Sequence, residues 1–329
     1  MSDKDPISEL LHTPVPQILW HYTSFDGFKG ITESRKIFAT DVGFLNDTQE
    51  FVHARSVAER IVQEAPEQGA LLFPWRESLR KIVESSFGSA LFSENTEVYV
   101  SSFSEHEDDL SQWRAYSHRG SGVSLGFDLS LLRPPDHINS LVCFAPCVYK
   151  PDKQMKLIRF ALDLFVTGGQ KYWTTVINEL LKVDHKELLT MSVEEKVKLI
   201  SIIEGHRKWG EQLDALAETT CVQVWKLASL LKNSTFEAEK EWRLVLPVGR
   251  EKKKLKYSRK FRAVDNSLVP YIAFPLDEMP EGKLPLRKVV IGPGGHPKAE
   301  SAISRWIDSL DLKVKVEVMR SKVPYRATT

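Results

Sequence analysis

The segment FEAEKEWRLV, residues 236–245, places charged side chains directly before a hydrophobic run. Glu239, Glu241 and Arg243 occupy alternate positions in it, and side chains alternate between the two faces of a β-strand. The spacing therefore predicts a strand over residues 239–247 with all three charges on one face. Because buried carboxylates without partners are costly, such a face predicts either a solvated groove or an ion-pair network.

On both sides of this segment, β-rich stretches occur in the two halves of the chain. Short strands are predicted at residues 17–22, 36–40, 97–104, 123–128, 144–150, 261–264, 271–274 and 288–291. Between them, residues 153–232 carry amphipathic helical patterns with few β runs. The predicted architecture is a single α+β domain over residues 1–329, with residues 153–232 as a helical insertion.

Composition limits the classes of function. The formal net charge is +1, so a role on nucleic acid or an anionic membrane needs a local basic patch. The three cysteines are too few for a disulfide framework and favour a reducing compartment. No stretch has the length of a membrane span, and the N-terminus lacks the pattern of a signal peptide. We therefore expect a cytoplasmic protein, and the sequence predicts no metal site.

Two further segments are candidates for a binding site. His21 and Tyr22 end a predicted strand, where main chain can hold one imidazole nitrogen while the other faces a ligand. A capping or core histidine is the alternative. The segment SSFSEHEDDLSQWRAY, residues 101–116, combines serines around Phe103 with a tryptophan and a tyrosine one helical turn apart. Aromatic residues at this spacing either pack in a core or form a wall for a flat ligand ring.

Glycine-rich and basic segments give weaker signals. IGPGGHPKAES, residues 291–301, lacks the phosphate-loop spacing, so a plain turn between strand and helix is favoured over a phosphate cradle. The run EKKKLKYSRKFR, residues 251–262, is the strongest basic patch and is interleaved with aromatic residues. It is either a solvated hairpin or a contact surface for a nucleic acid or another acidic partner. Its candidate contact residues are Lys252, Lys253, Lys254, Arg259 and Lys260.

Six motifs in one order carry a family resemblance. HYTS, LNDTQEF, SFSE with W-x-x-Y, GVSLGFD, FEAEKEWRLV and VVIGP follow one another over about residues 19–295. Together they resemble the bacterial family catalogued as domain of unknown function 2971. A more distant resemblance is to ADP-ribosyltransferases, which implies a fold of two small, split sheets that binds NAD as substrate.

The second resemblance implies roles for particular residues. His21-Tyr22 is similar to the histidine-bearing first strand of those enzymes, and Ser102-Phe103-Ser104 to their middle strand. Glu239-Lys240-Glu241 resembles the ExE pair of arginine-directed members, whose second glutamate is catalytic. A histidine start combined with an ExE end departs from both main clades, which leaves the modified target open.

The implied catalytic residues are Glu241, Glu239 and His21, and the implied NAD-binding residues are His21, Tyr22, Ser102, Ser104, Trp113, Tyr116 and Arg243. Breaking the bond between nicotinamide and ribose passes through an oxocarbenium-like state, which a carboxylate stabilises. In this interpretation Glu241 holds the ribose hydroxyl, Glu239 polarises the nucleophile, and an aromatic side chain stacks on nicotinamide.

The leading hypothesis is an ADP-ribosyltransferase-like enzyme that modifies a protein or a nucleic acid. By family-level analogy it acts as a toxin or a phage-defence effector. One alternative is a non-catalytic nucleotide- or nucleic-acid-binding module that uses the same cleft. Another is a metal-dependent nuclease built on Asn46, Asp47, Glu50, Asp108 and Asp109, although helix capping also explains these residues.

Overall fold

A computed structural model of the chain gives two compact units. Unit 1 comprises Met1–Glu50, Asn95–Lys150 and Ser229–Thr329, and unit 2 comprises Phe51–Glu94 and Pro151–Ala228. The structure describes residues 5–45, 49–68, 75–87, 97–117, 120–129, 142–180, 192, 194, 215–217, 219–248, 257–264, 267–276, 284–310, 312 and 314–324. Helices and a mixed, open sheet occur together, which confirms the α+β class. No helix of the described residues is long and apolar enough to cross a membrane.

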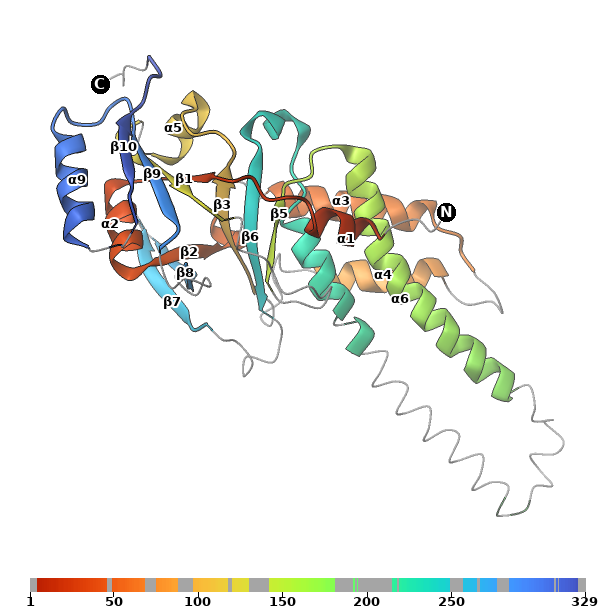
Figure 1. The fold of residues 1–329 in the computed structure, drawn as a ribbon. Coiled ribbons are helices and arrows are strands. Elements are labelled where there is room, and N and C mark those ends of the chain that lie inside the picture. The colour runs from red at the N-terminus through yellow and green to blue at the C-terminus, as the bar shows by residue number, and fades with distance from the viewer. Residues whose placement is uncertain are drawn as a thin grey trace. The chain divides into compact units, whose positions relative to one another are not determined.

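Unit 1 contains the sheet (Figure 1). Its strands are β1 (Leu19–Thr23), β2 (Lys36–Asp41), β3 (Glu97–Ser104), β4 (Val123–Phe127), β5 (Cys143–Pro146), β6 (Glu241–Val248), β7 (Arg259–Val264), β8 (Ser267–Pro275), β9 (Leu286–Ile291) and β10 (Glu317–Arg320). The main path runs β10-β9-β4-β1-β3-β2-β8-β7, and β6 joins β3 to β5. Only the β10–β9 pair is parallel among the strand pairs of the described residues.

The sheet divides at β3. Strand β6 pairs with β3 along its whole length, so it occupies one edge of that strand. The other edge is shared, because β1 pairs at Trp20↔Ser104 and β2 pairs at Thr40↔Val100. Between these two contacts, at Ser102, no strand of the described residues pairs with this edge of β3. We call the opening between β1 and β2 the fork.

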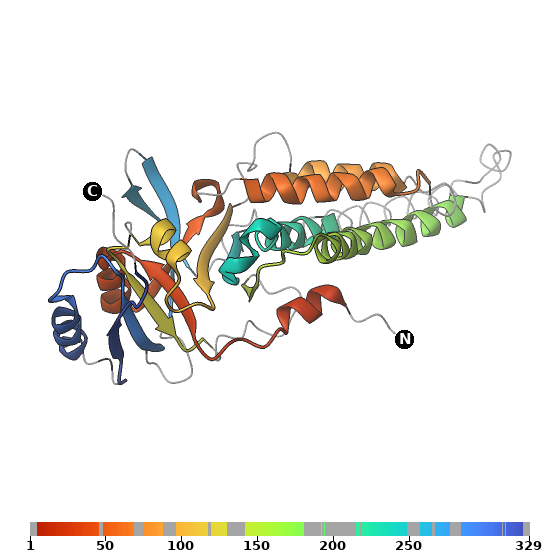
Figure 2. The same ribbon diagram turned by 90° about the horizontal axis from the view of Figure 1, so that it is seen from above.

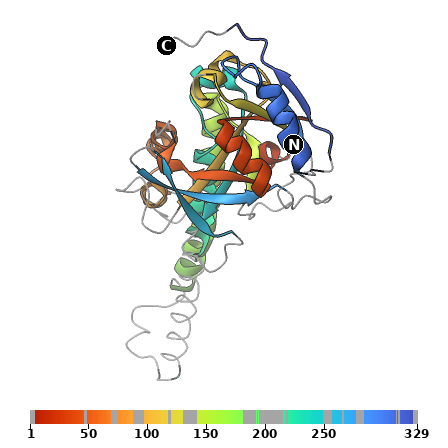
Figure 3. The ribbon, with the colours of Figure 1, turned by 90° about the vertical axis from the view of Figure 1, so that its left-hand side faces the viewer.

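The α-helices described in full within unit 1 are α1 (Pro6–Leu11), α2 (Phe25–Ser34), α5 (Leu110–Tyr116) and α9 (Ala299–Ser309). Ser24 caps α2 by accepting a hydrogen bond from the Gly27 amide, and Asp109 caps α5 in the same manner. Helices α2 (red) and α9 (blue) lie beside each other in Figure 3. Their apolar faces, with Phe28, Ile31 and Ile303, pack in the main hydrophobic core.

Unit 2 is helical (Figure 2). It contains α4 (Trp75–Phe87), α6 (Pro151–Leu180) and all but the first two residues of α3 (Gln49–Glu64). Its helices therefore come from two separate stretches of chain. Much of the predicted insertion 153–232, namely residues 181–191 and 195–214, lies outside the described residues, so the single-domain organisation stays a prediction.

The segment 236–245 is not one continuous strand. A 3-10 turn, η3 (Ser234–Glu239), precedes β6, and Lys240 between them has a φ of 42°. That left-handed conformation interrupts an extended chain, so the prediction that Glu239 belongs to the strand is wrong. Glu241 and Arg243 lie on β6 and share a face, as the alternation predicted. The opposite face places Trp242 in the core.

The glycines of residues 292–295 form a structural turn. The amides of Gly292 and Gly294 donate to the carbonyl oxygens of Gly122 and Gly120, each at 2.9 Å. A side chain at Gly292 would place its Cβ 2.4 Å from the Gly120 oxygen. These amides are therefore used within the protein, in agreement with the plain turn that the spacing favoured.

Candidate functional site

A cleft of about 660 Å³ opens at the fork of the sheet in unit 1. Its volume lies within the range of small-molecule sites, about 300–1,000 Å³. Side chains from β1, β2, β3, β6, α2, α5 and the β7–β8 hairpin line it, and a smaller adjoining hollow of about 70 Å³ extends it toward Glu239. His21, Ser102 and Glu241, which lie far apart in the sequence, all line both spaces.

His21 is held at the fork by main chain. Its Nδ1 lies 2.9 Å from the carbonyl oxygen of Ser102, which only accepts hydrogen bonds, so Nδ1 carries the proton. Burial lowers the pKa of His21, and although the bond to Ser102 opposes this, the charge of Arg262 lowers it further. The imidazole is therefore neutral at pH 7, and its Nε2 is left as a hydrogen-bond acceptor.

Glu241 is the centre of a buried ion network, which we define as Lys232, Glu239, Glu241 and Arg243. Arg243 donates two hydrogen bonds to the Glu241 carboxylate, from Nε to Oε1 at 2.7 Å and from Nη2 to Oε2 at 3.1 Å. Lys232 Nζ approaches Oε2 to 2.5 Å. The exposed fractions of Lys232, Glu241 and Arg243 are only 3%, 6% and 3%. The structure thus has the ion-pair network rather than the solvated groove.

The network fixes the charges of its members. Burial disfavours the ionised form of Glu241, but the charges of Arg243 and Lys232 outweigh it and lower its pKa to about 2. Burial likewise opposes the charge of Lys232, yet attraction to Glu241 prevails and its pKa is raised. At neutral pH Glu241 is therefore a permanent anion, suited to stabilising positive charge and unsuited to accepting a proton.

Glu239 joins the network from outside the strand. Its Oε2 lies 2.7 Å from Lys232 Nζ, so this ammonium bridges the two glutamates. Glu239 is less buried than Glu241 and lines the smaller hollow. The pairing of the two carboxylates that the sequence predicted is therefore present through Lys232, although their placement on one strand is not.

The predicted aromatic residues occupy different environments. Trp113 is fully buried, its Nε1 donates to Asp108 at 2.7 Å, and it lines neither space, so it is not placed to stack on a ligand. Tyr22 lines the cleft but packs edge-on against Trp113, and its hydroxyl donates to the carbonyl of His106. Tyr116 is 43% exposed and lines both spaces, which makes it the best placed of the three for stacking.

The two predicted serines also differ. Ser102 lines the cleft beside His21. The Ser104 hydroxyl is buried, donates to the carbonyl of Glu239 at 2.8 Å and accepts from the His106 amide. Ser104 therefore anchors the turn that carries Glu239 rather than lining the cleft.

Lys232 and Arg262 are cleft residues that sequence reasoning missed. Lys232 lies in the predicted helical insertion and belongs to no motif. Arg262 ends the basic run, but its place in the cleft lining depends on the β7–β8 hairpin. Of the predicted contact residues in that run, Lys252, Lys253 and Lys254 lie outside the described residues, whereas Arg259 pairs with Glu97 and Lys260 is exposed.

Two of the acids proposed for a metal site, Asp108 and Asp109, have structural roles. Asp109 caps α5, and Asp108 accepts hydrogen bonds from Trp113 and Ser321. Asn46 and Asp47 lie outside the described residues. Within the described part of the chain, no group of three or more histidine, cysteine or acidic residues is arranged to hold a metal ion.

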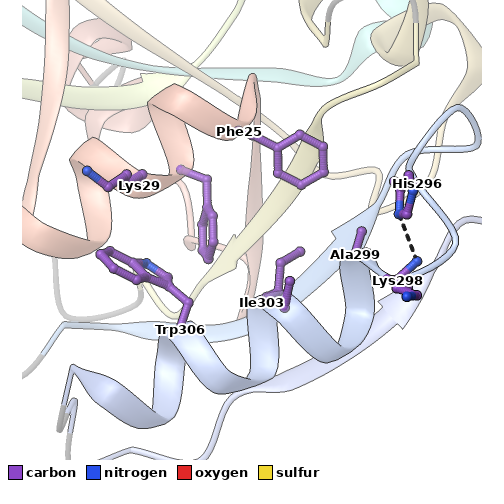
Figure 4. A pocket seen from close by; sticks show the side chains of 9 residues that line it. Phe25, Lys29, His296, Lys298, Ala299, Ile303 and Trp306 are labelled. Carbon is purple, nitrogen blue, oxygen red and sulfur yellow. Dashed lines mark hydrogen bonds between the residues drawn. The ribbon is translucent and has the colours of Figure 1, made fainter.

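A second hollow, of about 370 Å³, lies between α2 and α9 (Figure 4). We call it the α2–α9 groove. Phe25 and Lys29 face it from α2, Ile303 and Trp306 face it from α9, and His296 lies at one end. Its lining is almost entirely apolar and contains no carboxylate, so the cleft is the stronger candidate for a site of chemistry.

Comparison with known proteins found a similarity to a family without an assigned activity. Residues 112–244 match the family described as protein of unknown function (DUF2971). This region of the chain is similar to that family. The match begins in α5, ends in β6 and includes Tyr116, Lys232, Glu239, Glu241 and Arg243. No curated protein and no solved structure matched the chain.

Proposed function

We propose that the protein is an ADP-ribosyltransferase-like enzyme that uses NAD as substrate. The observation that carries the proposal is that His21, Ser102 and Glu241 line one cleft at the fork of a divided sheet. Division of the sheet beside the NAD site is also what the resemblance to ADP-ribosyltransferases implies. The cleft volume of about 660 Å³ is sufficient for a ligand of nucleotide size.

The charge state of Glu241 suits the reaction. The bond between the nicotinamide nitrogen and the ribose C1′ breaks, and its electron pair stays with nitrogen, so that neutral nicotinamide leaves. Positive charge then develops on the ribose, where the fixed anion of Glu241 stabilises it in a water-poor site. Arg243 and Lys232 hold this carboxylate in place and keep it ionised.

The other residues bind or assist. The Nε2 acceptor of His21 takes a hydrogen bond from a ribose hydroxyl, and Tyr116 stacks on the nicotinamide ring. Glu239, at the more open end of the site, polarises the incoming nucleophile of a protein or nucleic-acid acceptor. The electron pair of that nucleophile forms the new bond to C1′, and its proton passes to Glu239 or to solvent.

One observation favours a second candidate, a non-catalytic nucleotide-binding module. Both Glu241 oxygens already accept hydrogen bonds from Arg243 or Lys232, and a purely structural ion pair has the same arrangement. In that case the cleft binds a nucleotide without breaking it.

Nicotinamide release separates the two functions. Purified protein is incubated with adenosine-labelled NAD and candidate protein or RNA acceptors, and nicotinamide release and label transfer are followed. The enzyme is supported if wild-type protein releases nicotinamide and Glu241→Gln lowers the rate about 100- to 1,000-fold, the effect of removing one electrostatic stabiliser. Glu237→Gln, in the exposed part of the same turn, is the matched control.

Folding must be measured alongside activity, because Glu241 is buried in the network. Circular dichroism and a thermal melt show whether Glu241→Gln is folded at the assay temperature. Tight NAD binding with no nicotinamide release by wild-type protein would favour the binding module. Cutting of RNA or DNA that depends on magnesium or manganese would instead favour the nuclease.

A further inference from the structure

The cleft wall formed by β2 and the β7–β8 hairpin holds a guanidinium in a defined position. Arg262 Nη2 donates to the Thr40 hydroxyl at 2.9 Å. The guanidinium carbon also lies 6.0 Å from the ring centre of Phe38 and 5.9 Å from that of Tyr271. Such stacking and hydrogen bonding pre-organise an arginine without using all five of its N–H donors.

Three cations among the described residues line the cleft, and they differ in their partners. Lys232 and Arg243 are committed to the carboxylates of the ion network. Arg262 has no carboxylate partner among the described residues, whereas Arg259 on the same strand pairs with Glu97. A positioned arginine that faces a cleft without a carboxylate partner is suited to bind an anion. The paired N–H donors of its planar guanidinium match the oxygens of a phosphate in particular.

Arg262 lines the same cleft as His21. Its charge acts on His21, so the two side chains lie within electrostatic range of each other. The cleft is also lined by Ser101, whose buried hydroxyl has no hydrogen-bond partner among the described residues. The same cleft lining thus contains an unsatisfied buried hydroxyl and a guanidinium without a carboxylate partner among the described residues, which indicates that a polar ligand binds there.

We propose that Arg262 binds a phosphate group of the cleft's ligand, so that the site takes phosphorylated nucleotides in preference to nucleosides. This assignment rests on the proposed function only in naming NAD as the ligand, in which Arg262 meets the pyrophosphate while His21 meets a ribose hydroxyl. Arg262 acts in binding and specificity, and bond breaking is left to Glu241.

Calorimetric titration of full-length protein with three probes tests the assignment: NAD, nicotinamide riboside, which lacks phosphate, and inorganic pyrophosphate. Arg262→Gln is expected to weaken NAD and pyrophosphate binding by about 10- to 100-fold, the usual worth of charged hydrogen bonds. Binding of nicotinamide riboside should be unchanged. Arg262→Lys keeps the charge but lacks the paired N–H donors of the guanidinium. Its affinity for NAD and pyrophosphate should lie between those of Arg262→Gln and wild type.

Arg259→Gln is the matched control, because it removes a guanidinium from the same strand that is paired with Glu97. It should leave binding of all three probes unchanged. Equal weakening of NAD and nicotinamide riboside by Arg262→Gln, or no weakening of either NAD or pyrophosphate, would overturn the assignment.

The outcomes also separate this assignment from the proposed function. Wild-type protein that binds pyrophosphate through Arg262 but binds neither nicotinamide compound would support the phosphate site and overturn the use of NAD. If wild-type protein binds and cleaves NAD, and Arg262→Gln binds NAD with the same affinity, the use of NAD is supported and the phosphate site is overturned.

Discussion

The cleft at the fork and the α2–α9 groove border the same helix, yet only the cleft is lined by carboxylates and their ion partners. Gly27 and Gly30 of α2 line the cleft, whose far side carries the buried ion network. Phe25 and Phe28 of α2 line the groove, whose lining is almost entirely apolar. Apolar side chains are stable in a hollow by packing alone, whereas buried charges are costly to maintain. The difference therefore identifies the cleft as the place where selection for function is expected.

The largest difference in stability between cleft and groove is expected when the central cation of the network is removed. Lys232→Met leaves Glu239 and Glu241 without their ammonium and is expected to lower the free energy of unfolding by about 3–5 kcal/mol. Lys29→Met at the groove removes an exposed pair with Glu33 and should cost less than about 1 kcal/mol. Urea denaturation measures both.

Similar losses from Lys232→Met and Lys29→Met would mean that the network contributes no more than a surface pair. The cleft and the groove would then not differ in their contribution to stability.

The second largest effect is expected from acid, which should remove the stabilisation that Glu241 contributes. Because the pKa of Glu241 is about 2 in the folded protein and near 4.5 when unfolded, the unfolded state binds the proton first. The stabilisation from this group is thus present above pH 4.5 and is lost as the pH falls toward 2, roughly 3 kcal/mol in all. Urea denaturation between pH 6 and pH 3 follows the loss.

Glu241→Gln isolates that contribution, since it removes the titrating group and leaves every other carboxylate in place. The stability of this variant should fall less steeply with acid than that of wild type. Parallel pH profiles would show that Glu241 is not held ionised by its neighbours.

The groove should respond through stability alone. Ile303 is buried on α9, and Ile303→Ala is expected to lower the free energy of unfolding by about 2–3 kcal/mol through lost packing. NAD binding and nicotinamide release per folded molecule should not change, because the groove supplies none of the proposed chemistry. Denaturation curves and calorimetry on the same sample provide both values, and a lower NAD affinity in folded protein would connect the groove to the site.

Local sequence predicted the elements well where one pattern had one outcome. The β-branched and aromatic run of residues 97–104 predicted β3 with its bounds. The same reasoning failed at Glu239, because a left-handed residue at Lys240 ends the alternation without any glycine or proline to signal it.

The sequence by itself determined the residue types of the site: a histidine on β1, a serine on β3 and two glutamates near the start of β6. Only the tertiary structure decided their partners. Arg262 reaches Thr40 across 222 positions of chain, and His21 reaches Ser102 across 81. Whether a charge in the cleft is neutralised or left for a ligand depends on which distant segments the sheet brings together, and no local pattern encodes that arrangement.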